Sequence, residues 1–465
     1  MTDLTETVRA LLSNKRFATI RDLFATMNAA DIAPILSDQK ESDLPLLFRL
    51  LSTETAAETF VEMNPDEQEM LIRGFSDTEL KAVLSELYLD DAVDIIEEMP
   101  GILVPRILKA ADPESRKLIN ELLKYPEDSA GSIMTPEFVS LSPNETVEEA
   151  IDEIRRTGLD KETINVCYVA RADRTLLGSV SIRRILLSEA DDRIGDIADT
   201  NVIACETTDD QETVAQMLSK YDLIALPVVD HEKRIVGIVT VDDALDVLQE
   251  ENTEDIEKMA AITPSDRPYL ETSVPSIFLH RIPWLLLLML TSTMTELIIN
   301  LFTDKLNLFG AIAGAMLIAC IPMLMDTGGN AGGQSSATII RGLSLGEIEF
   351  SDFFRVIGKE LTVALMSGAV LAVINFVKMV LVNVVLYHYI GQDLAVYLIA
   401  SITISLAILL TIVVAKFAGC TLPMLAKKIG FDPAVMAAPF ITTMIDVTSL
   451  LLLFALANII LMHVR

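Results

Sequence analysis

The chain has 465 residues, a net charge of −31 and a mean hydropathy of +0.43. From residue 275 onward ten acidic side chains balance ten basic ones, whereas the part before it carries 57 acidic and 26 basic side chains. A strongly acidic part is thus followed by a neutral apolar one, which favours cation handling and argues against nucleic-acid binding. The four cysteines form no CxxC pair and no secretory signal precedes them, so a disulfide framework or a structural zinc site is not expected.

The first part of the chain is predicted to be an all-helical domain, residues 1–127. It is leucine-rich with helical periodicity and is interrupted by prolines. The sequences NPDE, SDTE and DPES, which begin at Asn64, Ser76 and Asp112, are typical of helix N-caps.

Residues 128–250 contain two copies of one pattern. TVEEAI at Thr146 is followed 67 residues later by TVAQML at Thr213, and GSVSI at Gly178 is followed 59 residues later by GIVTV at Gly237. Each copy has an amphipathic helix, β-rich runs and a second helix. The pattern predicts an internal α/β repeat.

An acidic segment that starts at Val241 is predicted to form a helix, and its continuation over residues 251–275 connects the repeat to the first apolar segment. Its acids recur every three or four residues along one face: Asp243, Asp246, Glu250, Glu254 and Glu257. Like charges at this spacing repel each other. A divalent cation that bridges them to a second acidic surface would favour a compact state. The alternative is a solvated acidic helix without such a role.

Residues 276–465 are predicted to form a multi-pass membrane domain, an α-helical bundle of five spans in the cell (inner) membrane. Each apolar stretch exceeds the roughly 20 residues that a spanning helix needs. The stretches are 282–302, 306–340, 361–386, 394–415 and 434–464. Lys and Arg side chains gather at the first span and at two of the connections: Arg281, Arg341, Arg355, Lys359, Lys427 and Lys428. This distribution predicts a cytosolic N-terminus and an external C-terminus at Arg465.

Asp446 is an acidic residue inside the last apolar stretch. A charge at membrane depth costs roughly 2.5 to 3.5 kcal/mol, so it marks an ion path or a structural ion pair. The neighbouring hydroxyls of Thr442 and Thr443 are hard ligands, and the absence of histidine and thiolate suits Mg²⁺ rather than zinc or copper. The alternative for Asp446 is an ion pair with Lys378 or Lys416.

The second apolar stretch has a polar face, because Asp326, Asn330 and Gln334 recur every four residues. Asn330 is a candidate for the lining of an ion path, with polar packing as the alternative. Asp326 is either a second ion site or a paired structural acid. The glycines between them, Gly328, Gly329, Gly332 and Gly333, either line a cavity or let neighbouring helices approach closely.

Two resemblances follow from these motifs. The repeats resemble a pair of cystathionine-β-synthase (CBS) domains, whose motif G-h-h-T-x-x-D is matched by Gly237, Thr240 and Asp243. YPEDSAGSIMTPEFV from Tyr125, TGGNAGGQSSATIIRGL from Thr327 and DPAVMAAPFITTMIDVTSLL from Asp432 resemble the MgtE family of magnesium transporters and channels. The resemblance spans nearly the whole chain.

The resemblance to the MgtE family implies a homodimer with Asp446 as the central Mg²⁺-binding residue of the pore. It also implies Mg²⁺-sensing acids in the CBS pair and connecting helix, at Asp210, Glu212, Asp222, Asp243, Asp246, Glu251, Glu254 and Asp255. Asp90, Asp91 and Asp94 are their expected partners in the helical domain. CBS pairs often bind ATP, but Arg184 stands in the first copy where the second has Asp243, so weak or absent ATP binding is expected.

The sequence therefore predicts a Mg²⁺ channel that is driven by the membrane potential and closed by cytosolic Mg²⁺. No P-loop, phosphorylation segment or catalytic triad is recognisable, so an enzyme is not expected. One alternative is a broader pathway for Mn²⁺, Co²⁺ or Ni²⁺. Another is a CBS-based membrane sensor that transports nothing.

Overall fold

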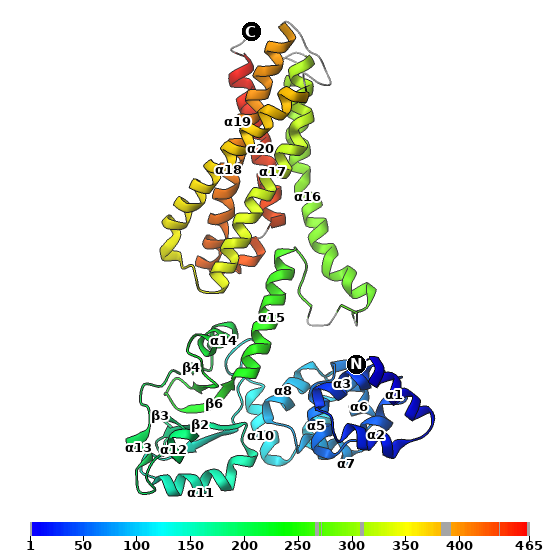
Figure 1. The fold of residues 1–465 in the computed structure, drawn as a ribbon, viewed down its shortest axis with the longest axis vertical. Helices are drawn as coiled ribbons and strands as arrows, with labels where there is room; N and C mark the ends of the chain where they lie inside the picture. The colour runs from blue at the N-terminus through cyan, green and yellow to red at the C-terminus, as the bar shows by residue number, and fades with distance from the viewer. Residues whose placement is uncertain are drawn as a thin grey trace. The chain divides into compact units, whose positions relative to one another are not determined.

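The computed structural model describes residues 2–265, 269–270, 272–306, 311–382, 392–436 and 438–462 (Figure 1). The chain forms two compact units, Met1–Leu248 and Gln249–Arg465.

The first unit begins with an all-helical domain, as predicted. Its described helices are α1 (Thr2–Ser13), α2 (Phe17–Phe24), α3 (Ala29–Ser37), α4 (Leu44–Phe48), α5 (Thr53–Val61), α6 (Pro65–Gly74), α7 (Asp77–Leu84), α8 (Leu89–Glu98), α9 (Val104–Ala110) and α10 (Pro113–Leu122). The three predicted N-caps are confirmed, because side-chain oxygens of Asn64, Ser76 and Asp112 accept hydrogen bonds from the first turns of α6, α7 and α10. A cluster of aromatic rings from Phe48, Phe60 and Phe75 packs in the core.

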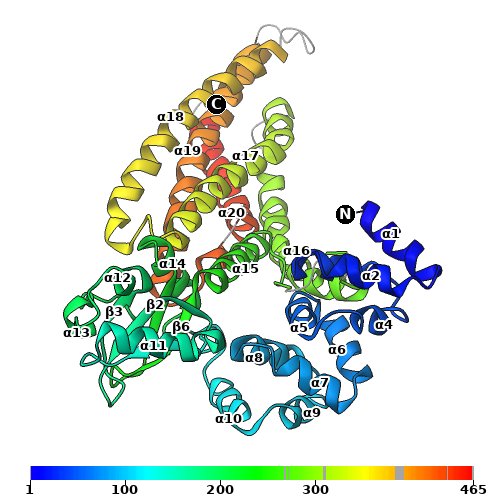
Figure 2. The same cartoon turned by 60° about the horizontal axis from the view of Figure 1, so that its bottom comes forward.

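Two three-stranded sheets follow, one from each copy of the repeat (Figure 2). The first copy contains β1 (Phe138–Leu141), α11 (Val147–Thr157), β2 (Thr163–Ala170), β3 (Leu176–Ser181) and α12 (Ile182–Leu186), followed by the short α13 (Ile194–Ile197). The second contains β4 (Cys205–Glu206), α14 (Gln211–Lys220), β5 (Ala225–Val229) and β6 (Ile235–Thr240). In each sheet the first strand runs parallel and the third antiparallel to the second strand. The predicted α/β repeat is thus confirmed.

The repeat glycines occupy equivalent positions in the two sheets. Gly178 pairs with Val169 and Gly237 pairs with Val228. A Cβ atom on Gly178 would lie 2.7 Å from the carbonyl oxygen of Asp199, and one on Gly237 would lie 2.7 Å from the sulfur of Met134. Glycine therefore recurs because another part of the chain approaches the strand closely at each position.

The helix α15 (Val241–Met259) begins in the first unit and ends in the second. It starts within the range 128–250 that the sequence assigned to the repeat, and it ends at Met259. The predicted connecting helix over residues 251–275 is therefore wrong beyond Met259, because the described residues between α15 and α16 are not helical. Its acidic residues are thus divided between the two units.

The second unit contains long helices: α16 (Val274–Leu306), α17 (Ala311–Ser344), α18 (Phe353–Val382), α19 (Gln392–Lys428) and α20 (Ala438–Met462). Among the described residues, five helices are long and apolar enough to cross a membrane, as predicted. α17 packs against α19 and α20, α18 packs against α19, and α16 packs against α20. Parts of the second, third and fifth predicted spans lie outside the described residues, and so does Arg465.

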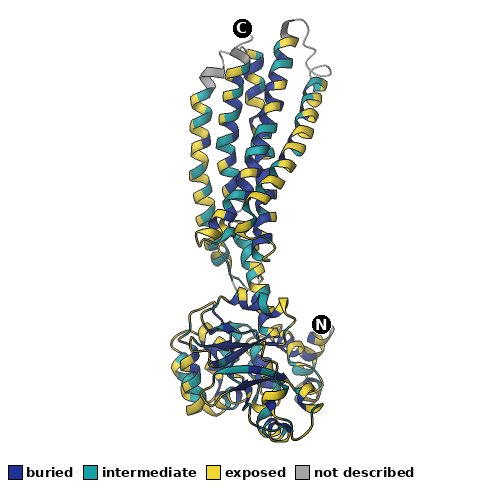
Figure 3. Ribbon diagram, turned by 90° about the vertical axis from the view of Figure 1, so that its left-hand side faces the viewer, coloured by how far each residue is buried: buried dark blue, intermediate teal, exposed yellow. Residues whose placement is uncertain are grey.

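Exposed residues run along the outward faces of these helices (Figure 3), and many of them are apolar. Leu285 and Leu290 on α16, and Met366 and Val373 on α18, are each more than half exposed. Side chains of this kind suit contact with lipid, because the backbone polar groups are already satisfied within the helices.

The buried face of α17 consists of small residues between Gly328 and Ser336. A Cβ atom on Gly329 would lie 2.8 Å from Cγ2 of Thr442 on α20, and one on Gly328 would lie 2.6 Å from Cγ2 of Thr411 on α19. A Cβ atom on Gly419 would collide with the carbonyl oxygen of Gly332. These glycines therefore form a packing seam, which was one of the two alternatives left open by the sequence.

Candidate ion path and acidic cluster

Asp446 lies on α20 with its side chain half-buried. Its Oδ1 atom is buried and has no hydrogen-bond partner among the described residues. A buried carboxylate oxygen without a donor is costly unless a cation or water occupies the space beside it.

The two lysines considered as partners of Asp446 are engaged elsewhere. The Nζ atom of Lys416 lies 3.1 Å from Oγ of Ser335 and 3.7 Å from Oε2 of Glu360. The Nζ atom of Lys378 lies 2.9 Å from the sulfur of Met323. The structure therefore assigns neither lysine to Asp446.

Thr442 lies one helical turn before Asp446, and its methyl and hydroxyl groups both approach Gly329. Thr443 points its hydroxyl to the carbonyl oxygen of Pro439 at 3.1 Å, so that this group is satisfied within α20. Of the two threonines, Thr442 is thus the one that joins the helix of Asp446 to the helix of Asn330.

Asp326, Asn330 and Gln334 form an exposed polar stripe along α17. The stripe runs opposite the glycine seam, so one helix presents a packing face and a polar face. Polar side chains on a membrane-spanning helix require water, an ion or another polar surface beside them. The predicted common face of these residues is therefore present, and it is uncovered in a single chain.

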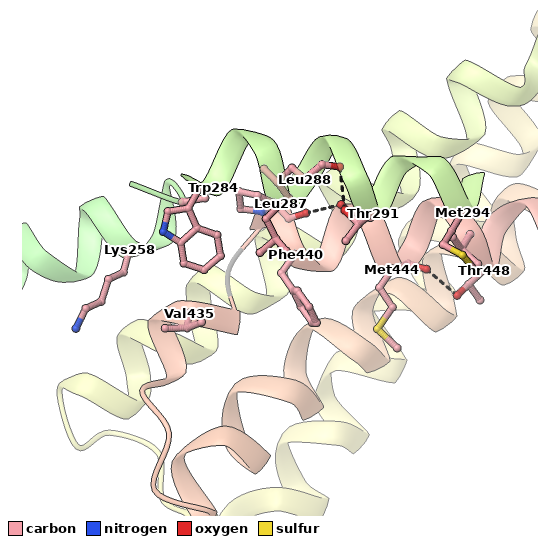
Figure 4. A pocket seen from close by; sticks show the side chains of 14 residues that line it. Lys258, Trp284, Leu287, Leu288, Thr291, Met294, Val435, Phe440, Met444 and Thr448 are labelled. Carbon is pink, nitrogen blue, oxygen red and sulfur yellow. Dashed lines mark hydrogen bonds between the residues drawn. The ribbon is translucent and has the colours of Figure 1, made fainter. Parts of the chain in front are cut away.

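An apolar pocket of about 450 Å³ lies between α16 and α20 (Figure 4). The hydroxyls that line it are satisfied within their own helices, since Thr291 donates to the carbonyl oxygen of Leu288 and Thr448 to that of Met444. Trp284 and other apolar side chains form most of the remaining surface. Because a metal ion needs accessible oxygen ligands, this pocket does not provide an ion site.

The end of α15 is fastened to the membrane helices within the second unit. Oδ2 of Asp255 accepts a hydrogen bond of 2.8 Å from Ser344 at the end of α17. Lys258 forms ion pairs of 2.6 Å with Glu254 and 2.7 Å with Asp432, which precedes α20. Burial raises the pKa of Asp255 above its usual value, and the bond from Ser344 opposes this rise. Two of the predicted sensing acids, Glu254 and Asp255, are therefore in direct contact with groups that hold α15 in place.

A second group of acids gathers in the first unit, where α8 meets the two repeats. Its members, here called the acidic cluster, are Asp90, Asp91, Asp94, Glu137, Glu162, Asp242 and Asp243. The backbone N–H of Leu89 donates to Oε2 of Glu137 at 3.0 Å and so ties the start of α8 to the segment before β1. Beside it, an open pocket of about 650 Å³ has a largely acidic lining that includes Glu58, Glu62 and Asp91.

Burial is the main cause of the raised pKa values in the acidic cluster. It raises the pKa of Asp91 to about 6, with a smaller contribution from the charge of Asp243. It raises the pKa of Asp94 and that of Glu162 to about 7, and neighbouring carboxylates add to both shifts. The pKa of Asp90 is raised well above its usual value for the same reasons. The ionised carboxylates thus lack solvent and repel one another, and a cation would relieve both costs.

Two oxygen atoms of the acidic cluster are buried without a hydrogen-bond partner among the described residues, Oδ1 of Asp90 and Oε2 of Glu162. Within the described ranges no three His, Cys, Asp or Glu side chains already converge on one point as metal ligands. Mg²⁺ usually keeps several waters and is bound through one or two carboxylates, so a preformed cage is not required for it.

The other predicted sensing acids are not members of the acidic cluster, although Asp246 lies one helical turn from Asp243. Asp210 caps α14 by accepting a hydrogen bond of 3.2 Å from the N–H of Thr213. Glu212 accepts a hydrogen bond of 3.1 Å from the side-chain amide of Gln216. Asp222 follows the other end of α14, about 15 Å away along the helix, in an exposed turn. Asp246 is exposed on α15 and contributes to the raised pKa of Asp243, whereas Glu251 lies in the part of α15 that belongs to the second unit.

Glu137 and Glu162 were not recognised from the sequence. Glu137 lies in the turn before β1 and Glu162 directly before β2, and neither shares a helical spacing with Asp91 or Asp243. Only the packing of α8 against the repeats brings these residues together. A local pattern therefore offers no signal for them.

Comparison with known proteins covers both units. Family models match residues 27–128 (MgtE intracellular N domain), 130–191 and 194–250 (CBS domain) and 321–456 (MgtE, divalent cation transporter). The magnesium transporter MgtE of Thermus thermophilus is 34% identical over 95% of this chain and 95% of its own length. That of Bacillus subtilis is 30% identical over 96% of this chain and 95% of its own length.

Solved structures match the first unit. The crystal structure of the cytosolic domain of the Mg²⁺ channel MgtE in complex with ATP is 32% identical, covers 52% of this chain and 99% of its own, and has a TM-score of 0.51. The crystal structure of the soluble part of a magnesium transporter is 31% identical, covers 54% of this chain and 99% of its own, and has a TM-score of 0.50. With its helical domain, its paired repeats, its five apolar helices and these relatives along nearly the whole length, the chain belongs to the MgtE family of magnesium transporters.

Proposed function

We propose that the chain forms a Mg²⁺-selective pathway through the membrane in which Asp446 is the central binding residue. The observation that carries this proposal is the buried Oδ1 atom of Asp446, which has no hydrogen-bond partner among the described residues. Asp446 lies on α20, the helix that packs against the glycine seam of α17. Asn330 and Thr442 line the path beside it. A single carboxylate with hydroxyl and amide neighbours suits an ion that retains most of its water.

The membrane potential drives the ion inward. A divalent cation that crosses roughly 100 mV gains about 4.6 kcal/mol, since each charge contributes about 2.3 kcal/mol. A hydrolytic motor is therefore not needed. In this arrangement the N-terminus is cytosolic and the C-terminus is outside, and the lysines and arginines of the connections support that orientation.

The functional unit in this proposal is a homodimer. One chain leaves the polar stripe of Asp326, Asn330 and Gln334 uncovered. Two copies around a common axis would enclose both stripes in a shared aqueous path and bring two Asp446 carboxylates to it. This arrangement would satisfy the polar side chains that lipid cannot.

The domains take separate roles in this proposal. Residues 1–127 and 128–250 form the sensor, residues 251–275 connect it to the membrane domain and begin with the end of α15, and residues 276–465 form the pore. Cytosolic Mg²⁺ binds between Asp91, Asp94 and Asp243 of the sensor. The raised pKa values of Asp91 and Asp94 support this assignment, because buried carboxylates without a base favour a bound cation.

The signal from the sensor reaches the pore through α15. Bound Mg²⁺ favours a compact sensor, and α15 then holds the ends of α17 and α20 through Asp255 and Lys258. The remaining acids strengthen the local negative potential in this account: Asp210, Glu212, Asp222, Asp246, Glu251 and Glu254. The channel is thus closed when cytosolic Mg²⁺ is abundant.

We also propose that ATP binds weakly or not at all. Arg184 occupies the place in the first repeat that Asp243 holds in the second. A related cytosolic domain was crystallised with ATP, so titration of the purified chain with ATP tests the consequence of this difference directly.

Flux of Mg²⁺ into proteoliposomes tests the proposed path. Asp446→Asn should reduce the flux by at least about tenfold, since neutralising the acid removes the charge that attracts the ion. Thr448→Val is the matched control, because it lies on the same helix but faces the apolar pocket. Equal flux through wild-type protein and Asp446→Asn would show that the path lies elsewhere.

A further inference from the structure

A buried network of three side chains joins three of the membrane-spanning helices. Ser335 on α17 donates a hydrogen bond of 2.6 Å to Oε2 of Glu360 on α18. Lys416 on α19 donates to the same serine hydroxyl at 3.1 Å and lies 3.7 Å from Oε2 of Glu360. Ser335 and Lys416 are only 2% and 6% exposed.

Stability alone does not explain this network. A buried ion pair is often no more stabilising than apolar side chains of similar volume, and intramembrane charges are expensive. An apolar contact would hold α17, α18 and α19 together equally well. What a hydrogen-bonded charge pair adds is a single permitted geometry.

The packing face of α17 has no large side chain between Gly328 and Ser336. Side chains of the neighbouring helices occupy the space that the glycines leave, since Thr411 would contact a Cβ atom on Gly328 and Thr442 one on Gly329. This fit depends on the axial position of α17, and a polar contact that spans three helices holds that position. Ser335 follows Gly332 by three residues, and Lys416 precedes Gly419 by three. The network therefore lies beside the place where the backbones of α17 and α19 come closest.

We propose that Glu360, Ser335 and Lys416 are positioning residues for ion permeation. They fix the axial register of α17, and with it the position of Asn330 and of the seam on which Thr442 packs. The network itself does not touch the ion. This inference rests on the proposed path along α17 and α20.

Ser335→Ala in the full chain tests the proposal, because it removes the link to α17 and leaves Glu360 and Lys416 paired. We expect Mg²⁺ flux in proteoliposomes to fall by roughly tenfold, as for the loss of one charge-assisted hydrogen bond, and the ratio of Mg²⁺ to Mn²⁺ flux to change. Ser401→Ala is the matched control. Ser401 is also a fully buried serine, but among the described residues its hydroxyl bonds within α19, to the carbonyl oxygen of Tyr397 at 2.8 Å. This control should retain both the flux and the ratio.

The pair Glu360→Met with Lys416→Met provides a second test that leaves no charge unpaired. We expect an unchanged or higher melting temperature together with the same change in the Mg²⁺ to Mn²⁺ ratio. A folded variant with wild-type flux and ratio would overturn the proposal. The proposal would also be overturned if the flux fell only in proportion to the loss of folded protein while the ratio of Mg²⁺ to Mn²⁺ flux stayed at the wild-type value.

The pore assignment and the register inference fail in different ways. If Asp446→Asn leaves flux intact, the proposed path is wrong. If Asp446→Asn abolishes flux while the network variants keep the wild-type ratio, the inference about α17 alone is wrong.

Discussion

Buried charged residues in this protein are of two kinds. Lys416 is surrounded by its partners, Glu360 and Ser335. Asp446 and Asp90, in contrast, each retain a buried oxygen without a hydrogen-bond donor among the described residues. A paired charge fixes structure, whereas a buried acid that lacks a base favours binding of a cation. This difference separates the network of Lys416 from the residues assigned to Mg²⁺.

The acidic cluster predicts an unusual dependence of stability on pH. The pKa values of Asp91 and Asp94 are about 6 and about 7 in the folded chain, above the value for an exposed aspartate. The folded state therefore binds more protons than the unfolded state in this range, so stability rises as pH falls from about 8 to about 5. The amide protection factors of residues 89–98, which compare hydrogen exchange with the intrinsic rate at each pH, should therefore rise over this interval in the absence of Mg²⁺.

One substitution and the addition of Mg²⁺ test the cause of that pH dependence. Asp94→Asn should stabilise the Mg²⁺-free protein at pH 8 by roughly 1 kcal/mol and weaken the dependence, because the neutral amide avoids the repulsion. Millimolar Mg²⁺ should also weaken it by stabilising the ionised carboxylates. Protection factors that are higher at pH 8 than at pH 5 would contradict the assignment of buried acids in this region.

At the scale of elements, α17 combines two functions on opposite faces. Its glycine face allows α19 and α20 to approach, and its polar face carries Asn330. The contact of Gly332 with Gly419 is the closest of these approaches. A helix with this division can be both a packing centre and a wall of an ion path.

The seam predicts opposite effects of two glycine substitutions. Gly419→Ala should destabilise the second unit by about 1 to 3 kcal/mol, because the new methyl group would collide with the backbone of Gly332. Gly358→Ala is the matched control. It lies inside α18 with nothing within 4 Å of the added carbon, so helix propensity should make it neutral or stabilising by up to about 1 kcal/mol. Thermal unfolding in detergent measures both, and equal melting temperatures would contradict the seam.

Most of the helices and strands could be predicted from the sequence, whereas the tertiary contacts between them could not. Helix periodicity and caps such as Ser76 identify the helical domain, and the two glycine motifs identify the repeat. The acidic cluster depends on Glu137 and Glu162, which long-range packing brings to Asp91. Likewise, only the three-dimensional arrangement distinguishes Lys416, which pairs with Glu360, from a partner of Asp446.

At the scale of the whole molecule, one ion is proposed to act at two places. In this proposal the neutral part from residue 275 onward holds the path with Asp446, and the strongly acidic first unit holds the acidic cluster that senses Mg²⁺. A single helix, α15, carries Asp243 near one end and Asp255 and Lys258 near the other. Its contacts with Ser344 and Asp432 give the sensor a physical connection to the ends of α17 and α20.

Closure of the path by Mg²⁺ tests this account most directly. In proteoliposomes under an imposed potential, Mg²⁺ on the side of the acidic unit should reduce the flux of wild-type protein by about tenfold between roughly 0.1 and 10 mM, the range of weak carboxylate sites. The triple variant of the acidic cluster, Asp91→Asn, Asp94→Asn and Asp243→Asn, should remain open. The control triple variant neutralises three exposed acids and should close normally: Asp22→Asn, Asp31→Asn and Asp38→Asn. Wild-type flux that does not fall, or a triple variant of the acidic cluster that closes at the same concentration, would contradict it.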